Sequence, residues 1–140
     1  MNNNIINLWE QNKESLRNYF KITNQENYSS YKSLVKLIVE HILNNHEESY
    51  DIPMYNSERI TVIDDGDYQG TQLFLIPEDT YQPSSSEYLV TYTYYGSCSG
   101  CDTLQAIQGY EDELSSEEQI DDYMSLCLHL IQHMKPLYEN

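Results

Sequence analysis

Two cysteines and two histidines are the side chains of this sequence with the clearest potential for metal chemistry. Cys98 and Cys101 form a C-x-x-C motif, and His129 and His133 follow after a gap of 27 residues. The i, i+4 spacing of the histidines would place both imidazoles on one face of a helix. Two thiolates and two imidazoles can complete the tetrahedral shell of Zn²⁺, although this gap is longer than in a zinc finger. These four residues therefore predict a zinc site as one interpretation of the motif.

Two other interpretations of the cysteine motif require no metal. A C-x-x-C motif between a strand and a helix can lower the pKa of its first thiol, as in thioredoxin-like redox proteins. Here, Asp102 and the acidic residues beyond it would raise thiol pKa values, and no βαβ unit precedes the motif. In the third interpretation, Gly96 and Gly100 allow positive φ in a tight turn and Asp102 caps the next helix. We favour this structural turn, because it accounts for every residue of the segment.

Charge is distributed very unevenly along the chain. Seven basic residues face 23 acidic ones, which gives a formal net charge of −16. No Lys or Arg occurs between Ile60 and Met134, whereas 14 Asp and Glu residues do. Direct nucleic-acid binding is disfavoured, because it relies on positive side chains that neutralise phosphates. The negative field instead favours a basic protein as the partner.

The acidic residues form a row at the start of the last predicted helix. Carboxylates at i and i+4 repel each other by about 0.2–0.5 kcal/mol per pair, and their spacing of about 6 Å roughly follows phosphates along a nucleic-acid strand. The alternative is a solvated helix start that the helix dipole favours. No basic residue nearby in the sequence offsets these charges. The predicted partner-binding residues are Asp64, Asp65, Asp67 and Tyr68 in one turn, and Glu111, Asp112, Glu113, Glu117, Glu118, Asp121 and Asp122.

No complete catalytic motif occurs in the sequence. The acidic segment 64–67 lacks the alternate spacing and the terminal Glu of an EF-hand loop, and no glycine-rich segment carries the Lys of a phosphate-binding loop. The four histidines do not fit a Ser or Cys triad. We therefore predict that the protein is not an enzyme and has no cofactor other than the alternative zinc ion.

The elements that must position these residues follow from hydrophobic periodicity. A length of 140 residues fits a single domain, 1–140. Helical spacing of apolar residues predicts an N-terminal helix pair, over 4–21 and from a cap at Ser29 or Ser30 to Asn44. A short helix at 102–108 and a C-terminal helix at 116–135 follow the cysteine motif.

The middle of the chain has the pattern of strands. Segments rich in β-branched and aromatic residues predict a three-stranded antiparallel sheet at about 59–64, 71–76 and 87–95. The order of helices, strands and helices predicts an α+β fold with the helices packed on one sheet face. Tyrosine, with 14 copies, suits partly buried interfaces, so a homo-oligomeric scaffold, with a homodimer through the sheet, is a further alternative.

The chain carries no sign of export or membrane insertion. Its first residues lack a basic segment followed by an apolar run, and no apolar stretch reaches the roughly 18 residues that a membrane helix needs. The odd number of cysteines, three, also fits a reducing compartment. We therefore expect a cytoplasmic location and no membrane partner.

Part of the chain resembles a pattern found in small, mostly uncharacterised bacteriophage proteins. The segments DDGDYQGTQLFLI (64–76) and EYLVTYTYYGSCSGCDTLQAI (87–107) are similar to an acidic hairpin that leads into a strand and a GSCSGCD turn. The resemblance covers roughly residues 60–107 and brings no assigned site. It implies a role in host takeover or counter-defence. With the charge distribution, it predicts an anti-CRISPR-like inhibitor that binds the basic nucleic-acid groove of a host effector in the host cytoplasm.

Overall fold

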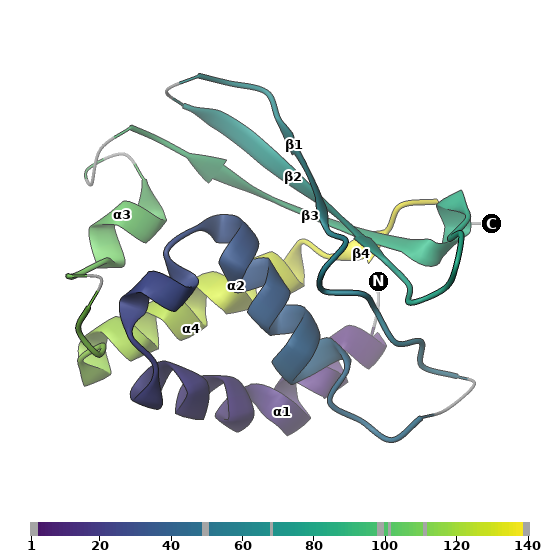
Figure 1. Ribbon diagram of the computed structural model, residues 1–140, viewed down its shortest axis with the longest axis horizontal. Coiled ribbons are helices and arrows are strands. Elements are labelled where there is room, and N and C mark those ends of the chain that lie inside the picture. Colours follow the sequence, from purple (N-terminus) through teal and green to yellow (C-terminus); the bar gives the residue numbers. More distant parts are fainter. Residues whose placement is uncertain are drawn as a thin grey trace.

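The protein has an α+β fold with a four-stranded antiparallel sheet in the order β1-β2-β3-β4 (Figure 1). The computed structural model describes residues 3–48, 51–67, 69–97, 100, 102–110 and 112–138. The helices are α1 Asn3–Ile22, α2 Tyr31–Ile38, α3 Thr103–Ile107 and α4 Glu117–Gln132. The strands are β1 Thr61–Asp64, β2 Gly70–Pro77, β3 Tyr88–Tyr95 and β4 Lys135–Pro136. The α+β class predicted from the sequence is therefore confirmed.

Local side-chain hydrogen bonds define where the helices begin. Ser30, rather than Ser29, caps α2, and its hydroxyl accepts a hydrogen bond from the Ser33 amide at 3.1 Å. Ser116 caps α4 in the same way, with Gln119 as the reciprocal partner. Such capping boxes satisfy amide groups that have no partner within the helix. The predicted second helix continues past α2, but as a π-helical turn, Val39–Leu43.

The end of the last predicted helix is a correction. The helix ends at Gln132, and the next residues turn to form β4, which pairs with Leu89 and Val90 of β3. The three-stranded sheet predicted from the sequence is therefore wrong by one strand. Pro136 cannot extend a helix and has no amide to donate, so it sits on a very short edge strand. The amide of Leu137 then donates to the Tyr88 carbonyl at 3.0 Å.

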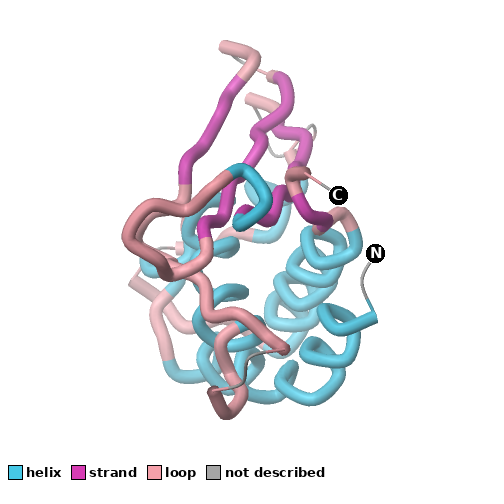
Figure 2. Tube along the Cα trace, turned by 90° about the vertical axis from the view of Figure 1, so that its right-hand side faces the viewer, coloured by secondary structure: helices cyan, strands magenta, loops and turns pink. Residues whose placement is uncertain are grey.

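One buried cluster joins residues of the sheet and of the long helices. Phe74, Ile76 and Leu89 belong to the same cluster as apolar residues of α1, α2 and α4. The hydroxyl of Thr91 donates to the Leu130 carbonyl of α4 at 2.7 Å, which satisfies a fully buried polar group. Figures 1 and 2 show the strands gathered on one side of the molecule and the long helices on the other.

An aromatic group fills the centre of this cluster. The rings of Phe20, Tyr28 and Tyr123 pack with centroids 4.8–5.4 Å apart. Both tyrosine hydroxyls have partners: Tyr123 donates to the side-chain oxygen of Gln25, and Tyr28 lies 2.8 Å from the Ser115 hydroxyl. Buried tyrosines need such partners, because an unpaired hydroxyl in the core is costly. None of the helices in the described part of the chain has the length and apolar character required to cross a membrane.

Candidate functional site

The two groups of predicted acidic residues lie on the same side of the molecule. In Figure 1 the β1–β2 turn lies at the upper left, the start of α4 at the lower left, and α3 between them. We call this region the acidic end; its described members from the predicted set are Asp64, Asp65, Asp67, Asp112, Glu113, Glu117, Glu118, Asp121 and Asp122. Tyr68 and Glu111, the other two predicted residues, lie outside the described residues.

In the β1–β2 turn, aspartate carboxylates accept hydrogen bonds from nearby residues of the same chain. Asp64 accepts hydrogen bonds from the Tyr95 hydroxyl, from the Gly66 amide at 3.0 Å and from the Gln72 amide group at 3.2 Å. Asp65 accepts from the Thr71 amide at 2.7 Å. The bonds from Tyr95, Gly66 and Gln72, in that order of effect, lower the pKa of Asp64. The carboxylate of Asp64 in turn raises the pKa of Tyr95 to about 12.

Close backbone approach explains the glycine at the tip of this turn. A Cβ atom on Gly66 would lie 2.0 Å from the carbonyl oxygen of Gln69. Its φ is not positive, and this holds for Gly96 as well. The positive φ that a glycine allows at position 96 is therefore not used. Gly96 instead contributes its backbone groups, since its amide donates to Asp102 and its carbonyl accepts from Gln105.

At the start of α4, the carboxylates face solvent. Glu117, Glu118 and Asp122 are exposed, and Ser116 and Gln119 occupy the capping positions. Asp121 is also exposed, but it accepts a hydrogen bond from Arg17 of α1 at 2.8 Å. The two residues are 104 positions apart, so the sequence could not reveal this pair. Asp112 and Glu113 are also exposed.

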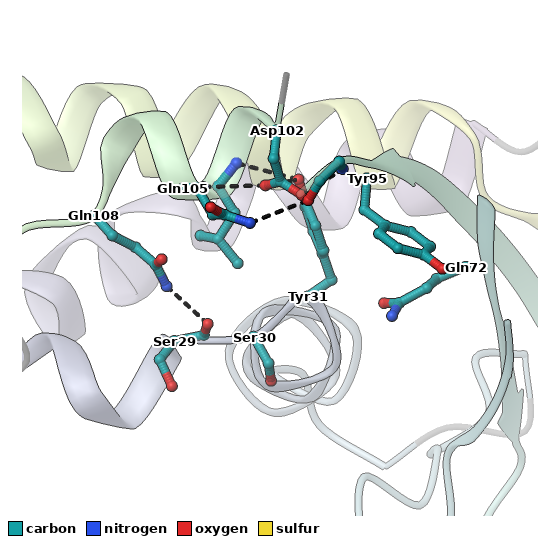
Figure 3. Close-up of a pocket in the computed structure, with 10 residues that line it drawn as sticks. Ser29, Ser30, Tyr31, Gln72, Tyr95, Asp102, Gln105 and Gln108 are labelled. Atoms are coloured by element: carbon teal, nitrogen blue, oxygen red, sulfur yellow. Dashed lines mark hydrogen bonds between the residues drawn. The ribbon is translucent and has the colours of Figure 1, made fainter. Parts of the chain in front are cut away.

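A polar pocket of about 210 Å³ lies beside the acidic turn (Figure 3). Its walls come from the first part of β2, the end of β3, the start of α2, and α3. The lining residues that matter below are Gln72 and Tyr95 from the sheet, and Asp102, Gln105 and Gln108 around α3. None of the ten residues that line the pocket is Lys or Arg.

Asp102 organises the floor of this pocket. Its side chain is only 6% exposed, and it accepts hydrogen bonds from the Tyr31 hydroxyl at 2.9 Å, the Gly96 amide at 2.8 Å and the Gln105 amide at 3.0 Å. The prediction that Asp102 caps the next helix is confirmed. Burial, together with the Asp102 carboxylate, raises the pKa of Tyr31. The network ties the starts of α2 and α3 to the end of β3, so the pocket is held by buried bonds.

The predicted zinc ligands are only partly described. Cys98 and Cys101 lie outside the described residues. His129 and His133 both line a second cleft, of about 160 Å³, beside Tyr92. The ring of His133 stacks on Tyr92 with centroids 4.3 Å apart, and its Nδ1 lies 3.1 Å from the Tyr92 carbonyl. Within the described part of the chain, no three His, Cys, Asp or Glu residues group so as to hold a metal ion.

The third cysteine is a core residue. Cys127 is fully buried in α4, and burial raises the pKa of its thiol. A thiol in such surroundings stays protonated and inert.

Sequence reasoning did not find the three pocket glutamines. Gln72, Gln105 and Gln108 belong to no motif, and an amide side chain carries no charge signal. They come from a strand and a short helix that are more than 30 positions apart in the sequence, so only the tertiary structure brings them together.

Comparison of the chain with protein-family models, with curated proteins and with solved structures found no match. The fold and the site define a small acidic α+β protein with a polar pocket at its acidic end. The resemblance of residues 60–107 to phage proteins stays a prediction.

Proposed function

We propose that this protein is an acidic inhibitor of phage type, such as an anti-CRISPR or another counter-defence protein. In this proposal the acidic end binds the basic nucleic-acid groove of a host effector in the host cytoplasm and excludes the nucleic acid. The observation that carries it is the placement of exposed, unneutralised carboxylates on one side of the molecule, within a 75-residue span free of Lys and Arg.

The internal ion pairs support this proposal. Among the described residues, Lys13, Arg17 and Lys36 pair with Glu10, Asp121 and Glu58. None of these pairs involves Glu117, Glu118 or Asp122, which are free to meet a basic surface. Complementary charge of this kind accelerates encounter and fixes orientation, and salt weakens it.

We propose that the action is steric and electrostatic rather than catalytic. The polar pocket contains a buried carboxylate whose oxygens already accept three hydrogen bonds, so it is poorly placed to act as a base. Ser15 and His41 do lie 3.0 Å apart, and burial lowers the pKa of His41. This pair bridges α1 and the π-helical turn outside the acidic end, where it connects two elements.

The direct test is to measure how an RNA-guided host nuclease binds and cleaves its nucleic acids with and without this protein, over a range of salt. The expected result is inhibition that weakens as salt rises. The double variant Glu118→Lys/Asp122→Lys should lose inhibition at least tenfold. The matched control Glu47→Lys/Glu48→Lys makes the same charge change at exposed positions of another segment and should keep it. Unchanged binding and cleavage at every salt concentration would end the proposal.

The cleft at His129 and His133 favours a second candidate, a zinc-stabilised or thiol-based protein-interaction module. If Nδ1 of His133 donates to the Tyr92 carbonyl, Nε2 is left as an acceptor, which is how metal-binding histidines are commonly oriented. Elemental analysis of the purified protein tests it: stoichiometric zinc that is lost in Cys98→Ser and His133→Ala would replace the first proposal with this one.

The sheet favours a third candidate, a homo-oligomeric scaffold. In this proposal the helices cover the sheet face that carries Phe74 and Thr91. The opposite face, with Thr71 and Tyr94 paired across β2 and β3, would then receive a second copy. On this face Tyr94 is 69% exposed. Light scattering over a range of concentrations tests it, with a dimer that dissociates in Tyr94→Ser as the supporting result.

A further inference from the structure

We infer that the polar pocket is a socket for an arginine side chain of the basic partner. The inference rests on the proposed function and adds to it the residue type that anchors the partner. Four groups that line the pocket carry the argument: the amides of Gln72, Gln105 and Gln108, and the Tyr95 hydroxyl. The fifth is the carboxylate of Asp64, which lies outside the lining and accepts hydrogen bonds from Tyr95 and Gln72.

Each glutamine around the pocket already uses one of its two amide N–H donors. The amide group of Gln72 donates to Asp64 at 3.2 Å, that of Gln105 to the Gly96 carbonyl at 3.0 Å, and that of Gln108 to the Ser29 carbonyl at 2.7 Å. The hydroxyls of Tyr95 and Tyr31 donate to Asp64 and Asp102. These bonds also set the orientation of each glutamine amide.

The acceptor oxygens of the three glutamines remain available to a ligand. A glutamine amide that donates through Nε2 presents its Oε1 as an acceptor. The Oε1 atoms of the three glutamines accept no hydrogen bond from the described residues. Figure 3 shows Gln72 on the sheet side of the pocket and Gln105 and Gln108 on the α3 side. A ligand between them therefore meets glutamine amide groups from two directions.

An arginine side chain satisfies these conditions better than other groups. A guanidinium has five N–H donors in one plane, no acceptor and a permanent positive charge. An anion would meet the ionised Asp64 and no lining Lys or Arg. A nucleobase has no positive charge to complement the carboxylate of Asp64. Lysine matches the charge, but its three donors radiate from one point and cannot spread between two walls.

The volume of the pocket also favours a single side chain as the ligand. A volume of about 210 Å³ is smaller than the roughly 300–1,000 Å³ of pockets that hold drug-sized ligands or cofactors. One side chain from a protein partner fits this scale. Arginine in a partly desolvated pocket is also a common anchor residue of protein interfaces.

The test uses the protein alone and small probes. N-acetyl-arginine amide is titrated into the ¹⁵N-labelled protein, and the side-chain amide signals of Gln72, Gln105 and Gln108 are followed by NMR. N-acetyl-citrulline amide, which has the same shape without the charge, and N-acetyl-lysine amide serve as comparison probes. The expected result is saturable shifts with the arginine probe and at least tenfold weaker binding of the other two.

Two variants of one residue give opposite expected effects. Gln108→Met removes one acceptor and should weaken the arginine probe about tenfold, since a hydrogen bond to a charged group contributes about that much. Gln108→Glu replaces the amide by a carboxylate and should tighten binding. Gln11→Met, at an exposed position of α1, is the matched control and should change nothing. Urea unfolding of each variant verifies that the fold is intact.

The outcomes separate the socket from the proposed function. Equal shifts with the citrulline and arginine probes, or no shifts at all, overturn the socket, and effector inhibition measured alongside decides the function by itself. If the arginine probe binds as expected while no effector is inhibited, the socket stands and the proposed inhibitor function falls.

Discussion

Among the carboxylates in and beside the acidic end, two groups differ in what they bind. Asp64, Asp65 and Asp102 accept hydrogen bonds from amides and hydroxyls of their own chain. Glu118 and Asp122, in α4, are exposed and belong to none of the ion pairs among the described residues. The first group builds turns and a helix cap, and the second leaves its charge available to a partner. Net charge therefore overstates the number of acidic residues that can bind another molecule.

The difference has a local physical cause. Turns and helix starts expose amide groups that need acceptors, and Asp is short enough to reach them. At α4, Ser116 and Gln119 already fill this role, so the carboxylates of the first turns have no amide to bind. They still favour the helix start through the dipole.

The largest effect on stability is expected at Asp102. In Asp102→Asn one of the two side-chain acceptors becomes a donor, so one of the three groups that bind Asp102 loses its partner in a buried site. We expect the free energy of unfolding to fall by about 1.5–3 kcal/mol, as for other hydrogen bonds to a charged group. Urea unfolding measures it, with the exposed Asp112→Asn as control. A loss no larger than that of the control would show that Asp102 belongs with the solvent-facing carboxylates.

The next effect is a pH dependence at Asp64. Its pKa is lowered in the folded state, below the ordinary value of 3.8, so its ionisation stabilises the fold above the unfolded pKa. This contribution is lost as pH falls through the folded pKa. The stability difference between the protein and Asp64→Asn should therefore shrink below about pH 4.

The Tyr95 hydroxyl is the main cause of this shift, which provides a second measurement. Tyr95→Phe should raise the midpoint of the Asp64 carboxyl titration, followed by NMR, toward its ordinary value. An unchanged midpoint would assign the lowered pKa to the Gly66 and Gln72 bonds instead.

A smaller effect is expected at the Arg17–Asp121 pair. Its carboxylate is 65% exposed, so solvent screens the interaction, and Arg17→Met should cost less than about 1 kcal/mol of unfolding free energy. The same change frees the Asp121 carboxylate. If the acidic end binds a basic partner, Arg17→Met should therefore leave affinity unchanged or raise it, as measured by surface plasmon resonance. A drop in affinity would instead place Arg17 itself in the interface.

The smallest effect on stability is expected in α4. Glu118→Gln/Asp122→Asn removes a like-charge i, i+4 pair and some favourable dipole interaction, so the free energy of unfolding should change by no more than about 0.5 kcal/mol. Partner binding should weaken strongly all the same. A large loss of stability in this variant would abolish the distinction between the two groups of carboxylates.

Much of the secondary structure could be predicted, because its signals are local. The periodic apolar residues of α1 and α4, and the alternation along β3, each lie within one element. β4 was missed because two residues, Lys135 and Pro136, have no period to detect. The π-helical turn after α2 was missed because its apolar residues continue the helical pattern.

For the candidate site, the sequence could predict only the acidic residues and the helix cap. The row of acidic residues at the start of α4 could be read directly, as could the cap at Asp102. The pocket could not, because its glutamines carry no motif and its network joins Tyr31 to Asp102 across 71 positions.

The sequence alone determined the placement of charge, the helix caps and the order of elements, because these depend on residues within about four positions of each other. The tertiary structure alone decided which carboxylates are free and where acceptors gather. Those properties depend on contacts such as Arg17 with Asp121, 104 positions apart, which form only when the buried cluster brings the elements together.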